Sequence, residues 1–412
     1  MNILMLGRWL PPPRRPVRGT REYHLARRLA GAHSVTVGFI NDSPDAAGSI
    51  SVLRSEFGDL EFAAVPRGWK SLASAVRSAA GESCTLSYFR SEALRTRLAD
   101  RMRRTRYDLV LVSSSSMIQY VFDMDPAIPL IVDFGEVDSL WWERQGRRSS
   151  LAARRFFRTE AMRLRAAECA VARRAARCLA ATPEAASFVQ RWAGATPAAV
   201  IRNGVDLEPA TVARSTGHPT VVLNSSLLEG EFEDAVRFCR EILPAVRLRV
   251  PETRFVLTSR SSDVTARAAA ELVGLEVAAT SADFRTLSNG RTVAVAPMWS
   301  GSDVHGSVLE PMAARLAVVA TSKACERLAV DGGRDLCTAG EAPEFAARVV
   351  ELLKNMSLRE QVAAQGRVFV EAHFSWPVCT APLEDIVRGV LGGVGGPPSP
   401  AAAKTVAAGR GA

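Results

Sequence analysis

Short apolar runs alternate with segments of helical period along most of the chain. The first run is 2–6, followed by an amphipathic segment over 21–30 and a second apolar run at 34–39. This alternation is typical of a parallel sheet that helices cover on both faces. The pattern therefore predicts a doubly wound α/β domain. Its further strands are expected at 60–65, 108–113, 129–134, 178–181 and 199–201.

A second alternation of the same kind begins near residue 220. It predicts a second parallel sheet, with helices near 233–249 and 342–355. The two alternations predict two Rossmann-like domains that face each other across a cleft. The expected strands of the second sheet are 220–223, 254–258, 275–279, 292–296 and 317–321.

The segment 207–219 separates the two alternations, has no clear periodicity and carries two prolines and a glycine. Such a segment is typical of a linker between domains. We expect an N-terminal domain over 1–207 and a C-terminal domain over 208–375, with a helix at about 376–390 that returns to the first domain. The Gly-, Pro- and Ala-rich segment 391–412 is expected to be a disordered tail.

Composition agrees with a folded two-domain protein. The chain has 412 residues, of which 47% are hydrophobic and 23% charged, which excludes a wholly disordered chain. No apolar run approaches the roughly 20 residues of a membrane-spanning helix. The apolar segment 1–7 is too short, and its start too uncharged, for a signal peptide. The seven cysteines and five histidines are scattered singly, so no metal site is expected. These features predict a soluble cytoplasmic protein.

The net charge of +9 favours anionic partners. Arginines are densest over 144–177, where interleaved apolar residues predict a basic amphipathic helix on an anionic membrane surface. The alternative is a long surface helix whose arginines pair with Glu143, Glu160 and Glu168. No recognised nucleic-acid-binding motif accompanies the charge, so nucleic acid is not an expected partner.

Ligands of open α/β sheets bind beyond the carboxyl ends of the strands. The loop after the first strand lacks the G-x-G-x-x-G pattern of dinucleotide sites. After the strand 292–296, a Gly/Ser-rich turn leads into a helix, whose N–H groups and dipole suit a diphosphate. Glu310, one turn further, is placed to accept hydrogen bonds from ribose hydroxyls. The alternative is a capped helix start with Glu310 at the surface.

Four segments carry a resemblance to a known family: 23–37, 132–139, the V-I-R-N-G-V-D run at 200–206, and 308–321 with its L-E-P-M-A motif. They resemble the GT-B fold glycosyltransferases of the large family 4 (group 1), which are retaining and independent of metal. The likeness covers nearly the whole chain to about Arg388. The V-I-R-N-G-V-D run is the most specific of the four.

The resemblance implies transfer of a sugar from a nucleotide-activated donor to a sugar, lipid-linked or small-molecule acceptor, in glycan, glycolipid or glycosylated-metabolite biosynthesis. It implies no cofactor and no metal. Peripheral attachment to the inner face of the membrane follows from a lipid-linked acceptor and the basic segment 144–177. On the donor side, the resemblance implies that Gly306 and Ser307 bind the diphosphate, that Glu310 binds the ribose, and that His305 and Arg260 make further donor contacts. It implies that Gly19 and Arg21 close over the phosphate from the first domain. It implies that Asp133 and Asp138 make catalytic contacts with acceptor or sugar hydroxyls.

The chain departs from the family pattern at the donor site. The first glutamate of the family's spaced pair is replaced by Ser302, and Pro311 is expected to bias Glu310 away from helical geometry. The basic pair that relatives place after the first strand of the second domain is absent, and Arg260 is the replacement candidate. These departures keep two alternatives open: a non-catalytic GT-B-like partner of an active transferase, and a nucleotide-sugar epimerase.

Overall fold

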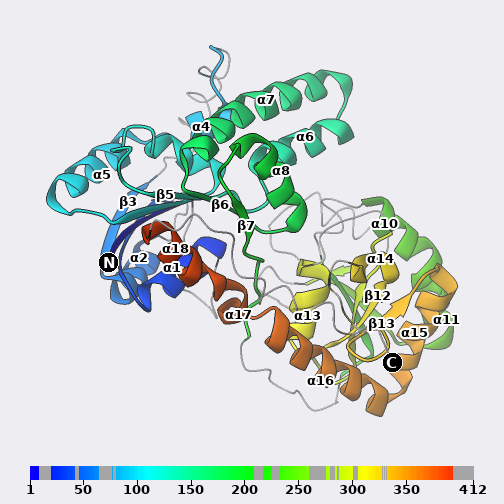
Figure 1. Ribbon diagram of the computed structural model, residues 1–412. Helices are drawn as coiled ribbons and strands as arrows, with labels where there is room; N and C mark the ends of the chain where they lie inside the picture. Colours follow the sequence, from blue (N-terminus) through cyan, green and yellow to red (C-terminus); the bar gives the residue numbers. More distant parts are fainter. Residues whose placement is uncertain are drawn as a thin grey trace. The chain divides into compact units, whose positions relative to one another are not determined.

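The protein forms two compact units in a computed structural model (Figure 1). Of the described residues, the first unit contains Met1–Gly204 and 379–392, and the second contains those of Val205–Val378. The predicted linker and tail lie largely outside the residues that the structure describes. These residues are 1–8, 20–41, 46–64, 77, 80–207, 217–224, 232–258, 275–278, 284, 287–299, 305–326, 328, 330 and 332–392.

The first unit is built on a seven-stranded sheet of order β3-β2-β1-β4-β5-β6-β7, in which all pairs are parallel. Its central strands β1 and β4 are apolar and buried except at Asn2, because helices cover both faces. The predicted strands of this domain are confirmed to within two residues at their ends. They are β1 (Asn2–Gly7), β2 (Ser34–Asn41), β3 (Asp59–Ala64), β4 (Leu109–Ser113), β5 (Leu130–Asp133), β6 (Arg177–Ala180) and β7 (Ala198–Val200).

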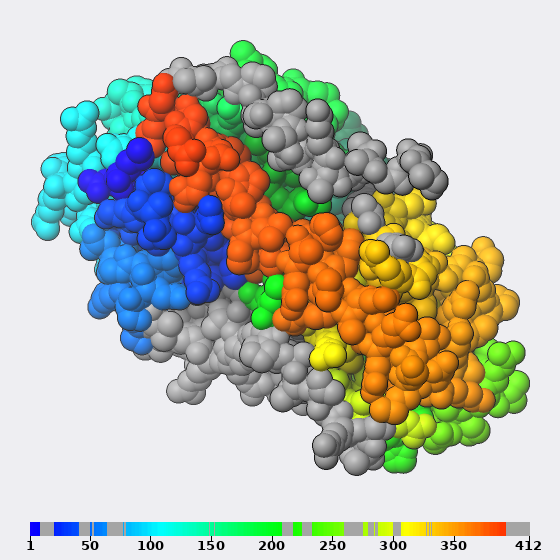
Figure 2. Space-filling view, turned by 60° about the horizontal axis from the view of Figure 1, so that its bottom comes forward, coloured from blue at the N-terminus to red at the C-terminus, as the bar shows by residue number. Residues whose placement is uncertain are grey.

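Two sets of helices cover this sheet. On one face pack α1 (Arg21–Ala30), α2 (Ala46–Phe57) and the C-terminal helix α18 (Pro382–Leu391). Figure 2 shows the orange-red α18 beside the blue segment that contains α1, and the two helices are in contact. The other face is covered by α5 (Glu92–Arg104), α7 (Leu151–Arg174) and α8 (Pro183–Ala193). Two short helices, α4 (Cys84–Tyr88) and η1 (Ser115–Tyr120), complete the described part of this layer.

The basic segment 144–177 is not the single helix that its composition predicts. It forms a hairpin of α6 (Asp138–Arg148) and α7, which lie side by side in Figure 1. Ser149 and Ser150 break the helix because neither has helical backbone angles. Gly146 allows the two helices to approach closely, since a Cβ added there would lie 3.2 Å from Cβ of Phe157. The last arginine of the segment, Arg177, is a buried residue of β6.

The second unit has a six-stranded parallel sheet of order β10-β9-β8-β11-β12-β13 around a single apolar core. All five predicted strands are confirmed, although the one at 275–279 shortens to two residues. The three-residue edge strand β13 was not expected. The strands are β8 (Thr220–Asn224), β9 (Arg254–Thr258), β10 (Glu276–Val277), β11 (Thr292–Ala296), β12 (Ala317–Thr321) and β13 (Cys337–Ala339).

Two of the described helices in this unit contain or follow a widened turn. The predicted helix at 233–249 consists of α10 (Phe232–Arg237), the π-helical turn η2 (Phe238–Ile242) and α11 (Leu243–Arg249). The π-helical turn η3 (His305–Leu309) likewise precedes α13 (Glu310–Ala313). In both places the second residue of the following helix is proline. Because proline has no N–H and its ring clashes with the carbonyl four residues back, the preceding turn opens to π geometry.

None of the described helices is long and apolar enough to cross a membrane. Four more helices belong to the C-terminal part of the chain. They are α14 (Ser322–Cys325), α15 (Ala342–Lys354), α16 (Met356–His373) and α17 (Trp376–Thr380).

Candidate functional site

Four consecutive serines, 113–116, begin at the last residue of the buried strand β4, at the carboxyl edge of the first sheet. Three of them donate hydrogen bonds to three different carboxylates. The Oγ atoms of Ser113, Ser114 and Ser115 donate to Asp133 Oδ2 at 2.8 Å, Asp138 Oδ2 at 3.4 Å and Glu168 Oε1 at 2.6 Å, respectively. This run is not among the site residues predicted from the sequence, although four polar residues at the end of a buried apolar run are a signal that could identify it.

The backbone around the serines is strained. Ser114 has φ 77° and Val137, just before α6, has φ 65°. Positive φ is costly for residues with a side chain and most of all for a β-branched one. Such strain concentrates at functional sites, where the surrounding structure holds it in place. Here two strained residues flank the carboxyl ends of β4 and β5, next to Asp138.

Asp133 and Arg21 form a buried ion pair. Arg21 Nε donates to Asp133 Oδ2 and Nη2 to Oδ1, both at 2.8 Å. Arg21 Nη1 donates to the carbonyl of Ile201 at 2.6 Å and to Asn203 Oδ1 at 2.9 Å. Asp133 is 0% exposed. Desolvation is the largest influence on the pKa of Arg21 and lowers it, but the attraction and hydrogen bonds of Asp133 outweigh it, so the pKa of Arg21 is raised. The ion pair therefore joins α1 and β5 to the segment that follows β7.

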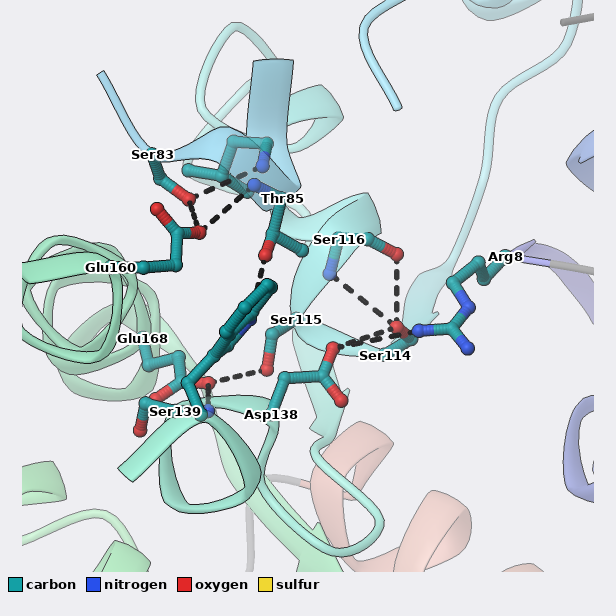
Figure 3. A network of polar contacts seen from close by, with 12 residues as sticks. Arg8, Ser83, Thr85, Ser114, Ser115, Ser116, Asp138, Ser139, Glu160 and Glu168 are labelled. Atoms are coloured by element: carbon teal, nitrogen blue, oxygen red, sulfur yellow. Dashed lines mark hydrogen bonds and ion pairs between the residues drawn. The ribbon is translucent and has the colours of Figure 1, made fainter. Parts of the chain in front are cut away.

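Asp138 differs from Asp133 in that its side chain is 29% exposed. It is the first residue of α6, and its Oδ2 lies 3.9 Å from Nη1 of Arg8 (Figure 3). Partial burial raises the pKa of the Asp138 carboxyl, while Arg8 and Ser114 oppose the shift. A carboxylate at the carboxyl edge of the sheet, aligned by a serine and an arginine and open to solvent, is suited to bind or deprotonate a substrate hydroxyl.

Glu168 lies behind Asp138, on the inner face of α7. Its Oε1 accepts from Ser115 Oγ and, at 3.2 Å, from the backbone N–H of Ser139 in the first turn of α6. Glu168 is 0% exposed, and its Oε2 has no hydrogen-bond partner among the described residues. Burial raises the pKa of Glu168. This side chain fixes the start of α6 and thereby positions Asp138.

Glu160, two turns earlier on α7, performs the same task for α4. It accepts from Ser83 Oγ at 2.7 Å and from the N–H groups of Cys84 and Thr85 at 2.7 and 2.9 Å (Figure 3). The alternative in which the arginines of 144–177 pair with three glutamates is therefore correct only for Glu143. That residue accepts from Arg147 at 3.0 Å and from Arg165 at 2.7 Å.

The predicted donor residues of the second unit share one helical segment. Gly306 and Ser307 are buried in η3, and Glu310 is the partly exposed first residue of α13. Asn224 Nδ2, at the end of β8, donates to the carbonyl of Gly306 at 2.8 Å and fixes the segment at the carboxyl edge of the sheet. Glu310 is helical, so the expected effect of Pro311 was wrong. The π-helical turn accommodates the proline instead.

Other predicted site residues cannot be placed. Gly19 and Arg260 lie outside the described residues, and of His305 only the backbone is described. Among the described residues no three His, Cys, Asp or Glu side chains are arranged to hold a metal ion.

Comparison with known proteins identifies part of this architecture. Residues 218–355 match the model of the family described as glycosyl transferases group 1. Residues 218–355, within the second unit, are thus similar to a group 1 glycosyltransferase domain. This domain contains Asn224, η3 and α13, and hence all the donor-side residues that the structure describes. No curated protein sequence matches the chain.

Solved structures show that the fold of the whole chain is GT-B. Sucrose-phosphate synthase from Thermosynechococcus elongatus superposes with a TM-score of 0.61 at 14% identity, covering 95% of this chain and 100% of its own. HepE from Anabaena, in complex with UDP and glucose, gives 0.60 at 14% identity, with 94% and 100% covered. TarM gives 0.61 at 9% identity, with 95% and 98% covered.

Proposed function

We propose that the protein transfers a sugar from a nucleotide-activated donor to the hydroxyl of an acceptor. The observation that carries this proposal is the group 1 glycosyltransferase domain with its helical segment 305–313 at the carboxyl edge of the sheet. Support comes from related folds, because HepE was solved with UDP-glucose and S. aureus TarM with UDP and α-GlcNAc-glycerol.

The proposed donor site lies in the second unit. Backbone N–H groups of Gly306 and Ser307 bind the diphosphate, and Glu310 accepts hydrogen bonds from the ribose. Such fixed donors stabilise the charge that develops on a leaving diphosphate, and they require neither a metal nor a cofactor. His305 and Arg260 remain proposed donor contacts, and Gly19 a proposed phosphate contact, on the family resemblance alone.

The proposed acceptor residue is Asp138, which is open to solvent and aligned by Ser114 and Arg8. For Asp133 and Arg21 we propose a supporting role in place of direct contact with substrate, because their charged groups are used by each other. We propose retention of stereochemistry from the family resemblance. The product belongs to glycan, glycolipid or glycosylated-metabolite biosynthesis.

We also propose that the protein attaches peripherally to an anionic membrane, at its cytoplasmic face, through 144–177. Arg154, Arg155 and Arg158 on α7 are exposed, and the buried glutamates of this helix do not neutralise them. An acceptor carried by a lipid would be reached from this position.

Thermal unfolding in the presence of UDP, GDP, TDP or CDP tests the donor site. A ligand that binds only the folded state stabilises it, by about 2.7 kcal/mol at a hundredfold excess over Kd. We expect stabilisation by one diphosphate, lost in Glu310→Ala and retained in Glu360→Ala, which removes an exposed glutamate of α16. No shift with any diphosphate would contradict the transferase and favour a non-catalytic partner protein.

A further inference from the structure

A pocket of about 370 Å³ lies between the two helices of the α6–α7 hairpin. Glu143 and Arg147 line it from α6, and Arg154, Arg158, Met162 and Arg165 line it from α7. Four arginines thus surround one glutamate. Neither the serine run nor the group 1 domain contributes to this pocket.

The charges of the pocket are unevenly satisfied. Glu143 holds Arg147 and Arg165, and their hydrogen bonds lower the pKa of Glu143. Arg154 and Arg158 are exposed and have no hydrogen-bond or ion-pair partner among the described residues. The paired arginines are fixed in position, and the other two supply positive charge that an anion can neutralise. A phosphate group, which accepts several hydrogen bonds from guanidinium groups, fits this arrangement.

Apolar side chains lie on the same stripe of α7 as these arginines. Residues 151, 154, 158, 162 and 165 are spaced so that they lie along one face of a helix. Leu151 is 85% exposed and Met162 is 56% exposed. Large apolar side chains with this much exposure are costly in water, and here they flank a positively charged pocket. A dissolved phosphate ion has no apolar part to cover these side chains, whereas a lipid surface offers phosphate and apolar chains together.

We propose that this arginine pocket binds the phosphate of an anionic phospholipid, while Leu151 and Met162 insert beside the headgroup. The inference rests on the proposed membrane attachment and assigns it to one site. It does not depend on the nature of the sugar donor. Arg154 and Arg158 contact the phosphate, and Glu143 holds Arg147 and Arg165 at the wall of the pocket.

Sedimentation of the full-length protein with vesicles tests the proposal. Vesicles of phosphatidylcholine with phosphatidylglycerol are compared at low ionic strength with vesicles of phosphatidylcholine alone. Wild-type protein is expected to sediment only with the anionic vesicles. The double variant Arg154→Gln/Arg158→Gln should bind about 30-fold more weakly, from the usual contribution of each arginine near an anionic surface. The variant Leu151→Ser/Met162→Gln should also bind more weakly.

A matched control removes the same charge elsewhere in the unit. Arg103→Gln/Arg104→Gln on α5 changes two exposed arginines and should bind like wild type. If this control lost as much vesicle binding as Arg154→Gln/Arg158→Gln, the result would overturn the proposed pocket and indicate unspecific charge attraction. Unchanged vesicle binding of the Leu151→Ser/Met162→Gln variant would overturn the insertion of these two side chains beside the headgroup.

The vesicle experiment separates this inference from the broader proposal. Failure of wild-type protein to sediment overturns membrane attachment altogether, and the pocket with it. Sedimentation of wild type together with equal binding of Arg154→Gln/Arg158→Gln overturns the pocket alone. The thermal unfolding midpoint of each variant without ligand is expected to match that of wild type, which shows that each variant is folded.

Discussion

Arg21 shows how far a residue's partners can differ from those that its position in the sequence suggests. It follows a proline- and arginine-rich loop at the start of α1, where a phosphate contact was the expected role. The structure instead pairs it with Asp133, 112 residues away, and with the carbonyl of Ile201. A spacing pattern does not contain such a partner, because the contact exists only after β5 and β7 join the sheet.

Replacing Arg21 with alanine should therefore destabilise the fold. The change leaves the buried carboxylate of Asp133 without its counter-charge, which typically costs about 3–5 kcal/mol. Urea unfolding measures the loss, and Arg27→Ala, an exposed change on the same helix, should stay within about 0.5 kcal/mol of wild type. Unchanged stability with weakened nucleotide binding would return Arg21 to the donor site.

Glu168 should make the stability depend on pH. Because burial raises its pKa above the ordinary 4.5, the folded protein holds this proton more tightly than the unfolded chain does. The resulting stability is present below pH 4.5 and is lost as the pH rises from there to the higher pKa of the folded state. Between these two pKa values the loss is about 1.4 kcal/mol for each pH unit.

Glu168→Gln removes this titration. The free energy of unfolding of the variant, relative to wild type, should therefore increase as the pH rises above 4.5. Urea titrations across this range measure the difference, with the exposed Glu184→Gln as the control. A constant difference at every pH would show that Glu168 titrates alike in both states.

At the scale of elements, the strands were predictable and the exact helices less so. Strands of parallel sheets are buried on both faces, so their apolar runs stand out from the surrounding polar segments. The three residues of β13 are too few to form such a signal. Helix ends depend on local breaks. The break at Ser149 and Ser150 was therefore not predicted from the overall amphipathicity of the segment.

The serine loop after β4 was predictable only in part. Its polar run marks the carboxyl edge of a sheet, but the division of the serines among Asp133, Asp138 and Glu168 depends on three other elements. The positive φ of Ser114 likewise follows from the fold rather than from the identity of the residue.

Two substitutions at Ser114 separate strain from hydrogen bonding. Ser114→Gly loses the hydroxyl but relieves strain of the order of 1–3 kcal/mol, so stability should be unchanged or rise by about 1 kcal/mol. Ser114→Ala keeps the strain and should lose about 1 kcal/mol. Both should lower kcat equally, because Asp138 is no longer aligned. Stability is measured by urea unfolding and kcat by sugar transfer.

The two variants also show what would contradict this account. Equal destabilisation by glycine and alanine would mean that the backbone of Ser114 stores no strain. An unchanged kcat in both would remove Ser114 from the positioning of Asp138.

At the scale of the whole molecule, the chain assigns its two proposed ligands to different units. The diphosphate segment 305–313 belongs to the second unit, and the arginine pocket belongs to the first. The GT-B fold was predictable because both alternations of strands and helices are complete, whereas the positions of side chains in each site were not.

Hydrogen exchange should show this separation directly. The nucleoside diphosphate that stabilises the protein is expected to slow exchange in peptides covering 305–313, and anionic vesicles in peptides covering 144–165. Mass spectrometry of both complexes gives the measurement. Protection of 305–313 by vesicles, or of 144–165 by the diphosphate, would contradict the assignment.

The two buried carboxylates of α7 have one more consequence, for changes in chain length. Glu160 accepts hydrogen bonds from the start of α4 and Glu168 from the start of α6. The number of residues between the two glutamates therefore decides whether both can point toward their partners. Inserting or deleting a single residue there rotates one carboxylate by about 100° around the helix. Substitutions of exposed residues of α7 leave both contacts in place, whereas a change in the length of the helix between these two glutamates does not.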